Sequence, residues 1–570
     1  MSKMKLDKTR GAWLINFCLG FVGRAQLKKL RKAAKDCKKT QSATLRKILE
    51  YAKNTEWGKS HNFEEILSAS TDEELYSLWK KNVPPAEYED FRPFIERHKN
   101  GEENILFPGK PKMYATTSGT TNKPKWIAIT DAYYSNVYSK MTKLWLYTFM
   151  MHRPKVFEGR AVSIVGKAIE TEAPDGTLCG SVSGVTRRDC PEFISKLHSA
   201  PHCTFDIENY DARYYSIIRI ALEQNVTLII TPNPSSILEM QKNIQQNFDR
   251  YVEDIEKGTL DKSLEIEPSI RMELESTLKP NPKRAEQLRQ LKKNGVDLIP
   301  KNYWPNMTAL TTWKCGNTKV YMNKFAGSFP DEMLYQEFSY FSSECRAGLV
   351  MNGKDDTVLF PHMHFFEFVE ESEIESPNPK FLQTSELEVG KRYSIYVTTF
   401  AGLYRYCMND LLEVTGMYNT IPTVQFIQKI NGIISMTGEK LHETQLIDAV
   451  QKTQDALNRE TKFYICFADV QNSVYHFYVE YENNELSQNE LEEFAELLDK
   501  NLRVENCEYD AKRDSKRIGR IIPHLLKENS LQLFKEFSLD AGLGRDGQFK
   551  FNILMQNEKT HNLIKKVEKI

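Results

Sequence analysis

The sequence predicts an α/β protein in which a large N-terminal domain, built of β-sheets layered with helices, precedes a small α+β domain. The chain of 570 residues exceeds the size at which a single hydrophobic core stops growing. Strand-like and helical runs alternate over residues 101–235 and again over 304–423, as expected for helices packed on sheets. Beyond about residue 430 this alternation gives way to longer helices and a strand pair, which indicates a second domain.

The overall composition narrows the class of protein and its partners. The 77 basic and 77 acidic residues give a formal net charge of zero, which argues against a nucleic-acid surface spread over the whole protein. Ten cysteines are scattered along the chain without a C-x-x-C pair, and in a chain of this length that pattern is typical of reduced thiols in a cytosol. We therefore expect a cytoplasmic protein with no nucleic-acid partner. We also expect a monomer, although no residue pattern identifies the oligomeric state.

A short apolar segment near the N-terminus lies between basic residues. Gly11–Gly23 follows four basic residues and precedes a basic run over 24–39; the four are Lys3, Lys5, Lys8 and Arg10. No small-residue cleavage site follows the apolar segment, which is shorter than the roughly 20 residues that span a bilayer. We expect a buried helix and no stable membrane insertion. An interfacial anchor held by the basic flank is the alternative.

The large domain is expected over residues 1–428, with a mainly helical lead-in over 1–100. Apolar residues recur there at helical spacing, namely Leu45, Ile48, Leu49 and Ala52. Further along, Ala161–Val165 and Val226–Ile230 read as strands. Residues 250–296 combine helical periodicity with many charges of both signs, which predicts a solvated helical insertion.

A hinge over 429–436 and a small domain over 437–570 are expected to follow. A helix is predicted from Glu443, and two strands flank the turn Asp469–Ser473. A capping box, Ser487 with Glu490, begins another helix with an apolar stripe.

The stretch Thr116-Thr-Ser-Gly-Thr-Thr-Asn-Lys-Pro-Lys125 lies between two apolar runs that we predict as strands. Its glycine allows close approach of the backbone, its amides and hydroxyls can meet phosphate oxygens, and its lysines can neutralise charge. It is not a Walker A loop, because G-x-x-x-x-G-K-[ST] is absent. Taken alone, a loop of this composition is more often a polar surface turn.

Two further clusters could complete a nucleotide site. In the first, Tyr340, Ser343 and Glu344 combine an aromatic face for a base with a carboxylate able to hold Mg²⁺. In the second, Tyr404 and Arg405 stand shortly before an acid. That acid is Asp410, and a carboxylate can accept both hydroxyls of a ribose. Each cluster alone is also compatible with a strand end or an ordinary ion pair.

Two lysines and two histidines remain as candidate site residues, the lysines for catalysis and the histidines for metal binding. Lys440 and Lys550 each stand near a flexible glycine, although a lone lysine is usually solvated. His362 and His364 have the spacing of one strand face, but no further spaced ligand follows. We therefore expect a structural strand there and no zinc site.

Taken in order, these clusters resemble those of the acyl-acid amido synthetases first known as auxin-responsive proteins of plants. That family belongs to the adenylate-forming superfamily. The similarity spans nearly the whole chain, and its landmarks are Glu56-Trp-Gly-Lys59, Trp304-Pro-Asn306, Phe365-Phe-Glu-Phe368 and Gln548-Phe-Lys550.

The resemblance implies roles for individual residues. Lys440 and Lys550 would be the catalytic lysines, and Glu344 would be catalytic and hold Mg²⁺. The residues expected to bind ATP are Thr116, Thr117, Ser118, Gly119, Thr120, Thr121, Lys125, Tyr340, Ser343, Tyr404, Arg405, Asp410 and Lys429.

Two positions depart from the family pattern. Asn409 replaces a glycine, and asparagine tolerates left-handed backbone angles, so the turn can be preserved. Lys429 stands where an arginine is common, and a lysine offers a point charge in place of a bidentate fork.

The implied activity is an ATP- and Mg²⁺-dependent ligase that adenylates a small carboxylic acid and transfers the acyl group to an amino acid. Two alternatives remain open at this point: transfer to CoA or a carrier thiol, and a degenerate homologue that serves as an interaction protein. Aromatics near Trp304 and Tyr321 could line the acyl pocket or belong to the core.

Overall fold

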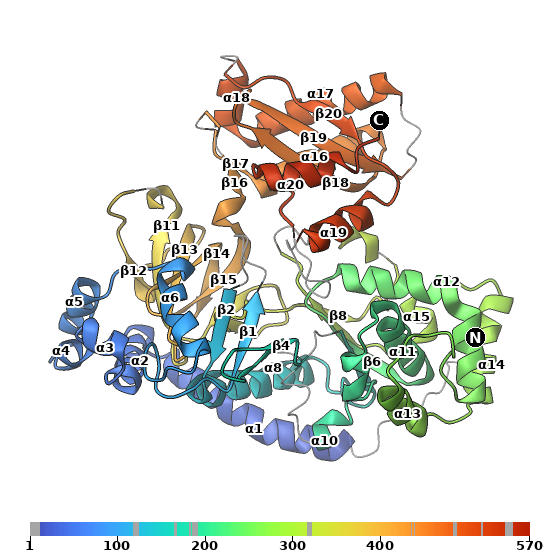
Figure 1. Cartoon of the computed structure of the whole chain (residues 1–570), viewed down its shortest axis with the longest axis horizontal. Helices are drawn as coiled ribbons and strands as arrows, with labels where there is room; N and C mark the ends of the chain where they lie inside the picture. Colours follow the sequence, from blue (N-terminus) through green and yellow to red (C-terminus); the bar gives the residue numbers. More distant parts are fainter. Residues whose placement is uncertain are drawn as a thin grey trace. The chain divides into compact units, whose positions relative to one another are not determined.

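A computed structural model of the chain describes residues 12–117, 125–164, 168–181, 184, 192–315, 322–325, 327–374, 376–434, 436–437, 439–482, 487–514, 517–541 and 551–569 (Figure 1). The described residues form two compact units. The first extends to Gln425, apart from Asn409–Leu412, and the second comprises that short piece and the chain from Phe426.

The first unit begins with a series of helices. They are α1 (Ala12–Ala33), α2 (Cys37–Ala52), α3 (Glu56–Ser60), α4 (Phe63–Leu67), α5 (Asp72–Asn82) and α6 (Tyr88–Lys99). Side-chain caps begin several of them: Asp36 accepts from the Lys39 amide at 3.0 Å and Thr71 from the Glu74 amide at 3.1 Å. The helical character predicted for this region is confirmed.

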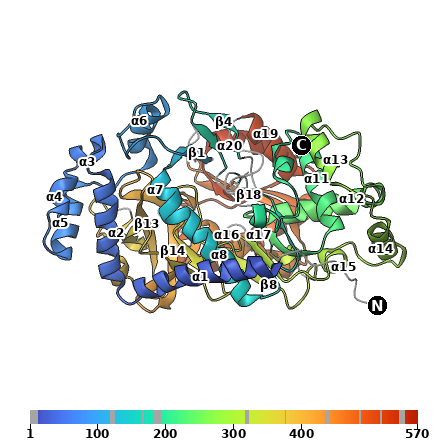
Figure 2. The same ribbon diagram turned by 90° about the horizontal axis from the view of Figure 1, so that it is seen from below.

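Helix α1 packs along α8 (Ser139–His152), which follows the short helix α7 (Asp131–Tyr133). Figure 2 shows α1 running beside α8 along the outside of this unit. Gly23 permits the close approach, because a Cβ there would lie 2.2 Å from the Tyr147 ring. The prediction of a buried helix is only half right, since α1 buries one face and leaves Trp13 and Phe17 exposed.

A small sheet carries the first motif. Its strand order is β2-β1-β5-β4, from β1 (Met113–Thr117), β2 (Lys125–Ile129), β4 (Thr171–Glu172) and β5 (Leu178–Gly180). Strands β1 and β2 are antiparallel, so the two predicted strands around the motif are confirmed.

A parallel sheet forms the centre of the next layer. Its order is β3-β6-β7-β8, from β3 (Arg160–Ser163), β6 (Val226–Ile230), β7 (Ala309–Thr312) and β8 (Leu334–Glu337), and every neighbouring pair is parallel. The predicted strand at Val226–Ile230 matches β6 residue for residue. Its five residues are all buried, as expected for a parallel strand covered on both faces.

Helices gather beside this sheet, drawn in green in Figure 1. They are α11 (Tyr210–Glu223), α12 (Ser235–Lys257), α13 (Pro268–Thr277), α14 (Pro282–Lys293) and α15 (Pro300–Tyr303), while the short α10 (Glu192–Ser195) precedes them. The helices predicted over 250–296 are present, but a solvated insertion is wrong. Tyr251, Ile255 and Leu288 are buried in one core with Trp304. Trp304 is therefore a core residue, and Tyr321 lies outside the described residues.

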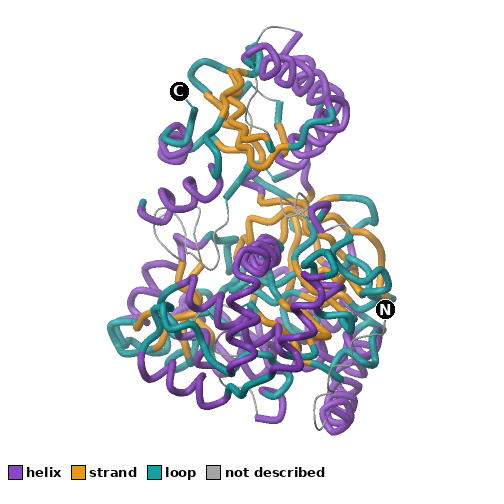
Figure 3. Tube along the Cα trace, turned by 90° about the vertical axis from the view of Figure 1, so that its right-hand side faces the viewer, coloured by secondary structure: helices purple, strands orange, loops and turns teal. Residues whose placement is uncertain are grey.

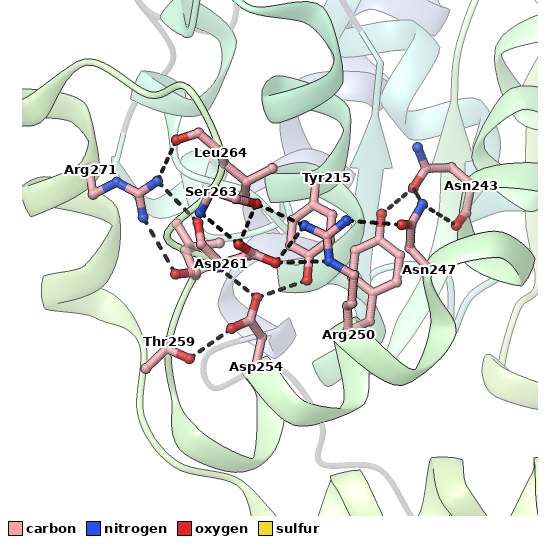
Figure 4. Close-up of polar contacts among 12 residues, drawn as sticks. Tyr215, Asn243, Asn247, Arg250, Asp254, Thr259, Asp261, Ser263, Leu264 and Arg271 are labelled. Carbon is pink, nitrogen blue, oxygen red and sulfur yellow. Dashed lines mark hydrogen bonds and ion pairs between the residues drawn. The ribbon is translucent and has the colours of Figure 1, made fainter.

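The charges of this region are paired with one another, which allows it to pack (Figure 4). Asp254 accepts hydrogen bonds of 2.8 Å from the hydroxyls of Tyr215 and Thr259 and from the Asp261 amide. Asp261 in turn accepts from Arg250 at 2.8 Å and from Ser263 at 2.7 Å. These hydrogen bonds, first those from Ser263, hold the pKa of Asp261 at about 2.

A seven-stranded sheet belongs mainly to the first unit, and two parts of its strands, Asn409–Leu412 and Phe426–Lys429, belong to the second. Its order is β12-β11-β13-β14-β15-β10-β9, from β9 (Gly348–Val350), β10 (Thr357–Leu359), β11 (Phe365–Glu370), β12 (Leu382–Gln383), β13 (Arg392–Thr398), β14 (Tyr406–Tyr418) and β15 (Ile421–Lys429). His362 and His364 lie in the turn before β11 and not on a strand. No group of metal-ligating side chains occurs in the described part of the chain.

The second unit is an α+β sandwich. Strands β16 (Ile433–Ile434) and β17 (Leu441–His442) pair with each other, and a sheet of order β20-β19-β18-β21 follows. Its strands are β18 (Thr461–Asp469), β19 (Val474–Tyr481), β20 (Ile522–Leu525) and β21 (Leu554–Met555), and its helices are α16 (Glu443–Leu457), α17 (Gln488–Glu505), α18 (Cys507–Asp514), α19 (Ser530–Asp540) and α20 (Glu558–Lys565). The strands lie between helices on both sides in Figure 3.

Alternation along the strands builds the two cores of this sandwich. Phe463, Ile465 and Phe467 of β18 pack with α19 and α20. On the other face, Phe477 of β19 stacks on Phe494 of α17, with ring centroids 5.9 Å apart. The predicted helix from Glu443, the strand pair and the Ser487 capping box are all confirmed. The hinge over 429–436 and the boundary at 428 stay predictions.

Candidate active site

The first motif is the connection of the β1–β2 hairpin. Thr116 pairs with Trp126, and Thr117 pairs with Lys125 across the hairpin. The Thr116 hydroxyl is buried and has no hydrogen-bond partner in the part of the chain that the structure describes. The residues Ser118, Gly119, Thr120 and Thr121 lie outside the described residues.

Lys125 brings the first and third motifs together. Its ammonium donates to the Tyr406 hydroxyl at 3.2 Å and lies 5.5 Å from the centre of the Tyr88 ring. Tyr406 begins β14, two residues after Tyr404. Residues some 280 positions apart in the sequence therefore meet at one place in the first unit.

The second motif follows the carboxyl end of β8 in a tight turn. Phe341 and Arg346 form an isolated β-bridge, and Ser342 and Cys345 exchange hydrogen bonds of 3.0 Å between them. Ser343 and Glu344 occupy the tip of this turn and are half-buried. Ligands of parallel sheets bind outside the carboxyl ends of the strands, so these two side chains stand where a ligand is expected.

Glu344 is a carboxylate without a partner inside the described protein. It makes no hydrogen bond and no ion pair with any residue that the structure describes, and the same holds for Ser343. A half-buried carboxylate of this kind is a suitable oxygen ligand for Mg²⁺.

Glu337, the last residue of β8, is a second acid at this edge, and the sequence motifs did not include it. It is buried and accepts a hydrogen bond of 2.6 Å from the Lys314 amide. Burial raises the pKa of Glu337 to about 7, against the lowering effect of its hydrogen bonds. The Lys314 ammonium pairs instead with Asp355 at 2.7 Å. The one signal that could have indicated Glu337 is an acid that ends a strand three residues before Tyr340.

The third motif requires a correction. Tyr404 is fully buried, and its hydroxyl donates to the Leu106 carbonyl at 2.5 Å. Arg405 is also buried, forming an ion pair with Glu367 at 3.0 Å and donating to the Val83 carbonyl at 2.7 Å. These contacts assign Tyr404 and Arg405 to the core, and we do not retain them as ATP contacts. Tyr340 of the second motif is also largely buried, and its role in binding ATP stays a prediction.

Asp410 and Lys429 contact each other in the second unit. The buried Asp410 forms an ion pair with Lys429, whose side chain is 44% exposed. They come from the neighbouring strands β14 and β15. Asn409 has φ 57°, a left-handed angle. The asparagine therefore keeps the backbone conformation that the family's glycine would allow.

Lys440 follows a turn whose conformation Glu439 fixes. The Lys440 side chain is exposed and its φ is 44°. Glu439 is buried, and burial opposes its ionisation, yet hydrogen bonds from the Met436 and Thr437 amides at 2.8 Å and the Tyr475 hydroxyl at 2.6 Å lower its pKa.

Glu443 ties the segment after Lys550 to the segment of Lys440. Its buried carboxyl accepts a hydrogen bond from the Ile553 amide. Burial raises the pKa of Glu443 to about 7, with the amides of Ile553 and Leu554 acting in the opposite direction. Lys550 itself lies outside the described residues.

Comparison with known proteins covers most of the chain. The GH3 family N-terminal domain matches residues 26–334, the GH3 family central domain matches 357–429, and the GH3 family C-terminal domain matches 444–559. The chain belongs to the GH3 family.

Two named relatives of this GH3 chain are plant proteins. It is 26% identical over 452 residues to a probable indole-3-acetic acid-amido synthetase, GH3.1, of Arabidopsis thaliana, covering 74% of this chain and 75% of the relative. It is 26% identical over 540 residues to the jasmonoyl–L-amino acid synthetase JAR4 of Nicotiana attenuata, covering 89% of each.

Solved structures confirm the fold class. A GH3.15 acyl acid amido synthetase superposes with a TM-score of 0.81 at 23% identity, over 96% of each chain. A 2-hydroxyisobutyryl-CoA ligase in its postadenylation state superposes with a TM-score of 0.54 at 11% identity, over 92% of this chain and 91% of the other. The GH3 chain therefore has the adenylate-forming fold, with a large N-terminal and a small C-terminal domain.

The core assignment of Arg405 can be tested against its predicted role in binding ATP. Replacing Arg405 by alanine leaves the Glu367 carboxylate buried without its cation, so we expect a loss of about 3–5 kcal/mol in the free energy of unfolding. Urea denaturation measures this loss. The matched control is Arg392→Ala, which removes a half-exposed pair with Glu413 and should cost less than about 1 kcal/mol. Unchanged stability with a raised KM for ATP would contradict the assignment.

Glu443 predicts a pH dependence of stability. Because its pKa rises from 4.5 to about 7 in the folded state, the folded protein holds a proton that the unfolded chain releases between these values. Stability should therefore fall as pH rises from 4.5 to 7, by about 3 kcal/mol for this group.

Glu443→Gln should remove that slope, because a neutral amide has no proton to lose. Urea denaturation at a series of pH values compares the variant with wild type and with Glu460→Gln, an exposed acid of the same unit. A difference between Glu443→Gln and wild type that does not change with pH would refute the prediction.

Proposed function

We propose that this GH3-family chain is an AMP-forming ligase that joins a small carboxylic acid to an amino acid. Two relatives that align over most of the chain are named as a probable indole-3-acetic acid-amido synthetase and a jasmonoyl–L-amino acid synthetase. The observation that carries the proposal is Glu344, a half-buried carboxylate with no partner among the described residues, at the carboxyl end of a parallel strand. The acid and the amine are to be identified by substrate screening.

The reaction proceeds in two steps. A carboxylate oxygen of the acid attacks the α-phosphorus of ATP, the bond to the β-phosphate oxygen breaks, and pyrophosphate leaves with that electron pair. The amine nitrogen of the amino acid then attacks the acyl carbon, AMP departs with the electrons of the C–O bond, and the amine loses a proton. Activation is needed because AMP is a far better leaving group than the oxygen of a free carboxylate.

The contribution of the protein to the first step is positioning and charge neutralisation. Glu344 is suited to hold Mg²⁺, which would neutralise charge on the phosphates. We propose that the loop from Thr116 to Thr121 and Lys125 binds the phosphates, with Ser343 and Tyr340 at the turn after β8. Asp410, with Lys429 beside it, would accept the ribose hydroxyls.

The two lysines would serve the reacting centre. Lys440 is exposed at a left-handed position after the turn that the buried Glu439 fixes. We propose that Lys440 meets the α-phosphate and that Lys550 neutralises charge during adenylation. Rotation of the second unit about a hinge over 429–436, between the two steps, would move Lys550 away from the reacting centre and turn another face of this unit toward it.

The function is tested by screening pyrophosphate release from ATP and Mg²⁺ across a panel of carboxylic acids. Amide formation is then followed by mass spectrometry with free amino acids, and thioester formation with CoA. We expect acid-dependent pyrophosphate release and an amide product. A thioester as the product would show a CoA ligase, and no ATP binding by calorimetry would show an interaction protein.

Variants in the two units should slow the first step. We expect Lys550→Ala and Glu344→Gln each to lower the rate of adenylation by about 10²–10³-fold. The first removes a cation from the reacting phosphates, and the second removes a proposed ligand of the Mg²⁺ that would neutralise them. The controls are Lys559→Ala and Glu332→Gln, exposed residues of the same units. Pyrophosphate release at the wild-type rate in either variant, with the fold intact, would remove that residue from the mechanism.

A further inference from the structure

Helix α1 has two faces of different character. Its inner face packs on α8 through buried apolar residues such as Ile15 and Leu19. Its outer face carries the aromatic residues Trp13, Phe17 and Phe21, which are 73%, 70% and 74% exposed. Residues four apart lie above one another on a helix, so the three rings form one stripe. Monomeric proteins rarely expose aromatic residues in such a row.

The same outer face becomes basic toward the C-terminal end of the helix. Arg24, Lys28 and Arg31 continue the line of the aromatic stripe, Lys32 lies beside them, and all four are exposed. Helix α1 contains no acidic residue. None of these four side chains forms an ion pair with the residues that the structure describes.

Lysines of neighbouring helices extend this positive charge. Lys140 of α8 lies close enough to Lys29, Lys47 and Lys143 for their charges to lower its pKa, in addition to the larger effect of burial. Lys47 comes from α2. Three helices thus contribute to one basic region near the C-terminal end of α1.

We propose that the outer face of α1 is a peripheral binding site for an anionic phospholipid membrane. The occupant follows from the chemistry of the face: aromatic rings enter the boundary between head groups and acyl chains, while lysine and arginine side chains meet lipid phosphates. Tryptophan in particular favours this interface. The proposal is independent of the ligase activity, since α1 contains none of the residues assigned to ATP.

Helix α1 would lie in the plane of the membrane surface and not cross it. No helix among the described residues is both long and apolar enough to span a bilayer. The inner face of α1 stays packed on α8, so only side chains of the outer face would enter the lipid. A single helix of this kind gives reversible binding.

The test is flotation of the full-length protein with vesicles of phosphatidylcholine, with or without phosphatidylserine. We expect binding to the vesicles with phosphatidylserine, weakened by salt, and little binding to phosphatidylcholine alone. A triple variant, Trp13→Ala, Phe17→Ala and Phe21→Ala, should lower the vesicle-bound to free ratio roughly tenfold or more. Replacing Arg24, Lys28, Arg31 and Lys32 by glutamine should have a similar effect.

Matched controls separate the face from general changes in charge or fold. The control for charge replaces four exposed lysines elsewhere in the first unit by glutamine, namely Lys262, Lys279, Lys283 and Lys293. The control for apolar surface is Met272→Ala, at a residue that is 71% exposed on α13. Both should bind vesicles as wild type does, and thermal unfolding checks that every variant is folded.

Several outcomes would overturn the proposal. One is that the wild-type protein fails to bind anionic vesicles at low salt. Another is that the α1 variants and the control variants lose vesicle binding to the same extent. If inorganic phosphate displaces the protein more than sodium chloride of equal ionic strength, the basic region binds soluble anions instead. If light scattering shows that the triple aromatic variant only turns a dimer into a monomer, the face is a contact between two copies.

Discussion

The buried ion pair between Arg405 and Glu367 connects three separate segments of the first unit. Burying two charges costs several kcal/mol each unless every remaining donor and acceptor is satisfied. Here Glu367 accepts from Arg405, the Tyr76 hydroxyl at 3.1 Å and the Trp79 indole at 3.0 Å, while Arg405 also donates to the Val83 carbonyl. The pair therefore joins α5, strand β11 and the approach to β14. The lead-in helix, the sheet and the third motif are held in one arrangement.

Two acids at the carboxyl edge of the parallel sheet show how position decides the role of a carboxyl group. Glu337 is buried, hydrogen-bonded to the Lys314 amide, and has a pKa of about 7. Glu344, seven residues later, is half-buried at a turn and lacks a partner among the described residues. Glu337 can be neutral near pH 7 and is suited to a structural role at this edge of the sheet, whereas Glu344 is suited to hold a cation. Only the turn after β8 separates these environments.

Features that depend on neighbours in the sequence were predicted well. The strand Val226–Ile230 and the helix from Glu443 were predicted because their patterns and caps are local. Ranges that depend on distant partners were not: residues 250–296 are charged yet pack into a core, because Asp254 and its neighbours pair internally. In the same way, α1 is apolar yet exposes one face, because α8 covers only the other.

The same distinction between local and distant features applies to the candidate site. The order and chemical type of the motifs pointed to the family, which needs no knowledge of contacts. Arg405 was predicted to bind ATP, because the sequence does not show that it contacts Glu367, 38 positions away. Glu337 was missed because its raised pKa arises from burial. The position of an acid at the end of a strand does not show from the sequence alone that the acid is buried.

The two departures from the family pattern make sense together in the second unit. Asn409 adopts φ 57° inside β14, so the left-handed position before Asp410 is kept without a glycine. Lys429 pairs with Asp410 through one flexible ammonium, where an arginine would hold a carboxylate with a rigid fork. The lysine is 44% exposed, so its ammonium can be solvated when it moves aside, and the buried Asp410 carboxylate then needs another hydrogen-bond donor in its place. We infer that lysine at this position leaves the Asp410 carboxylate easier to share with an incoming hydroxyl than arginine would, because one point contact and not two must be given up.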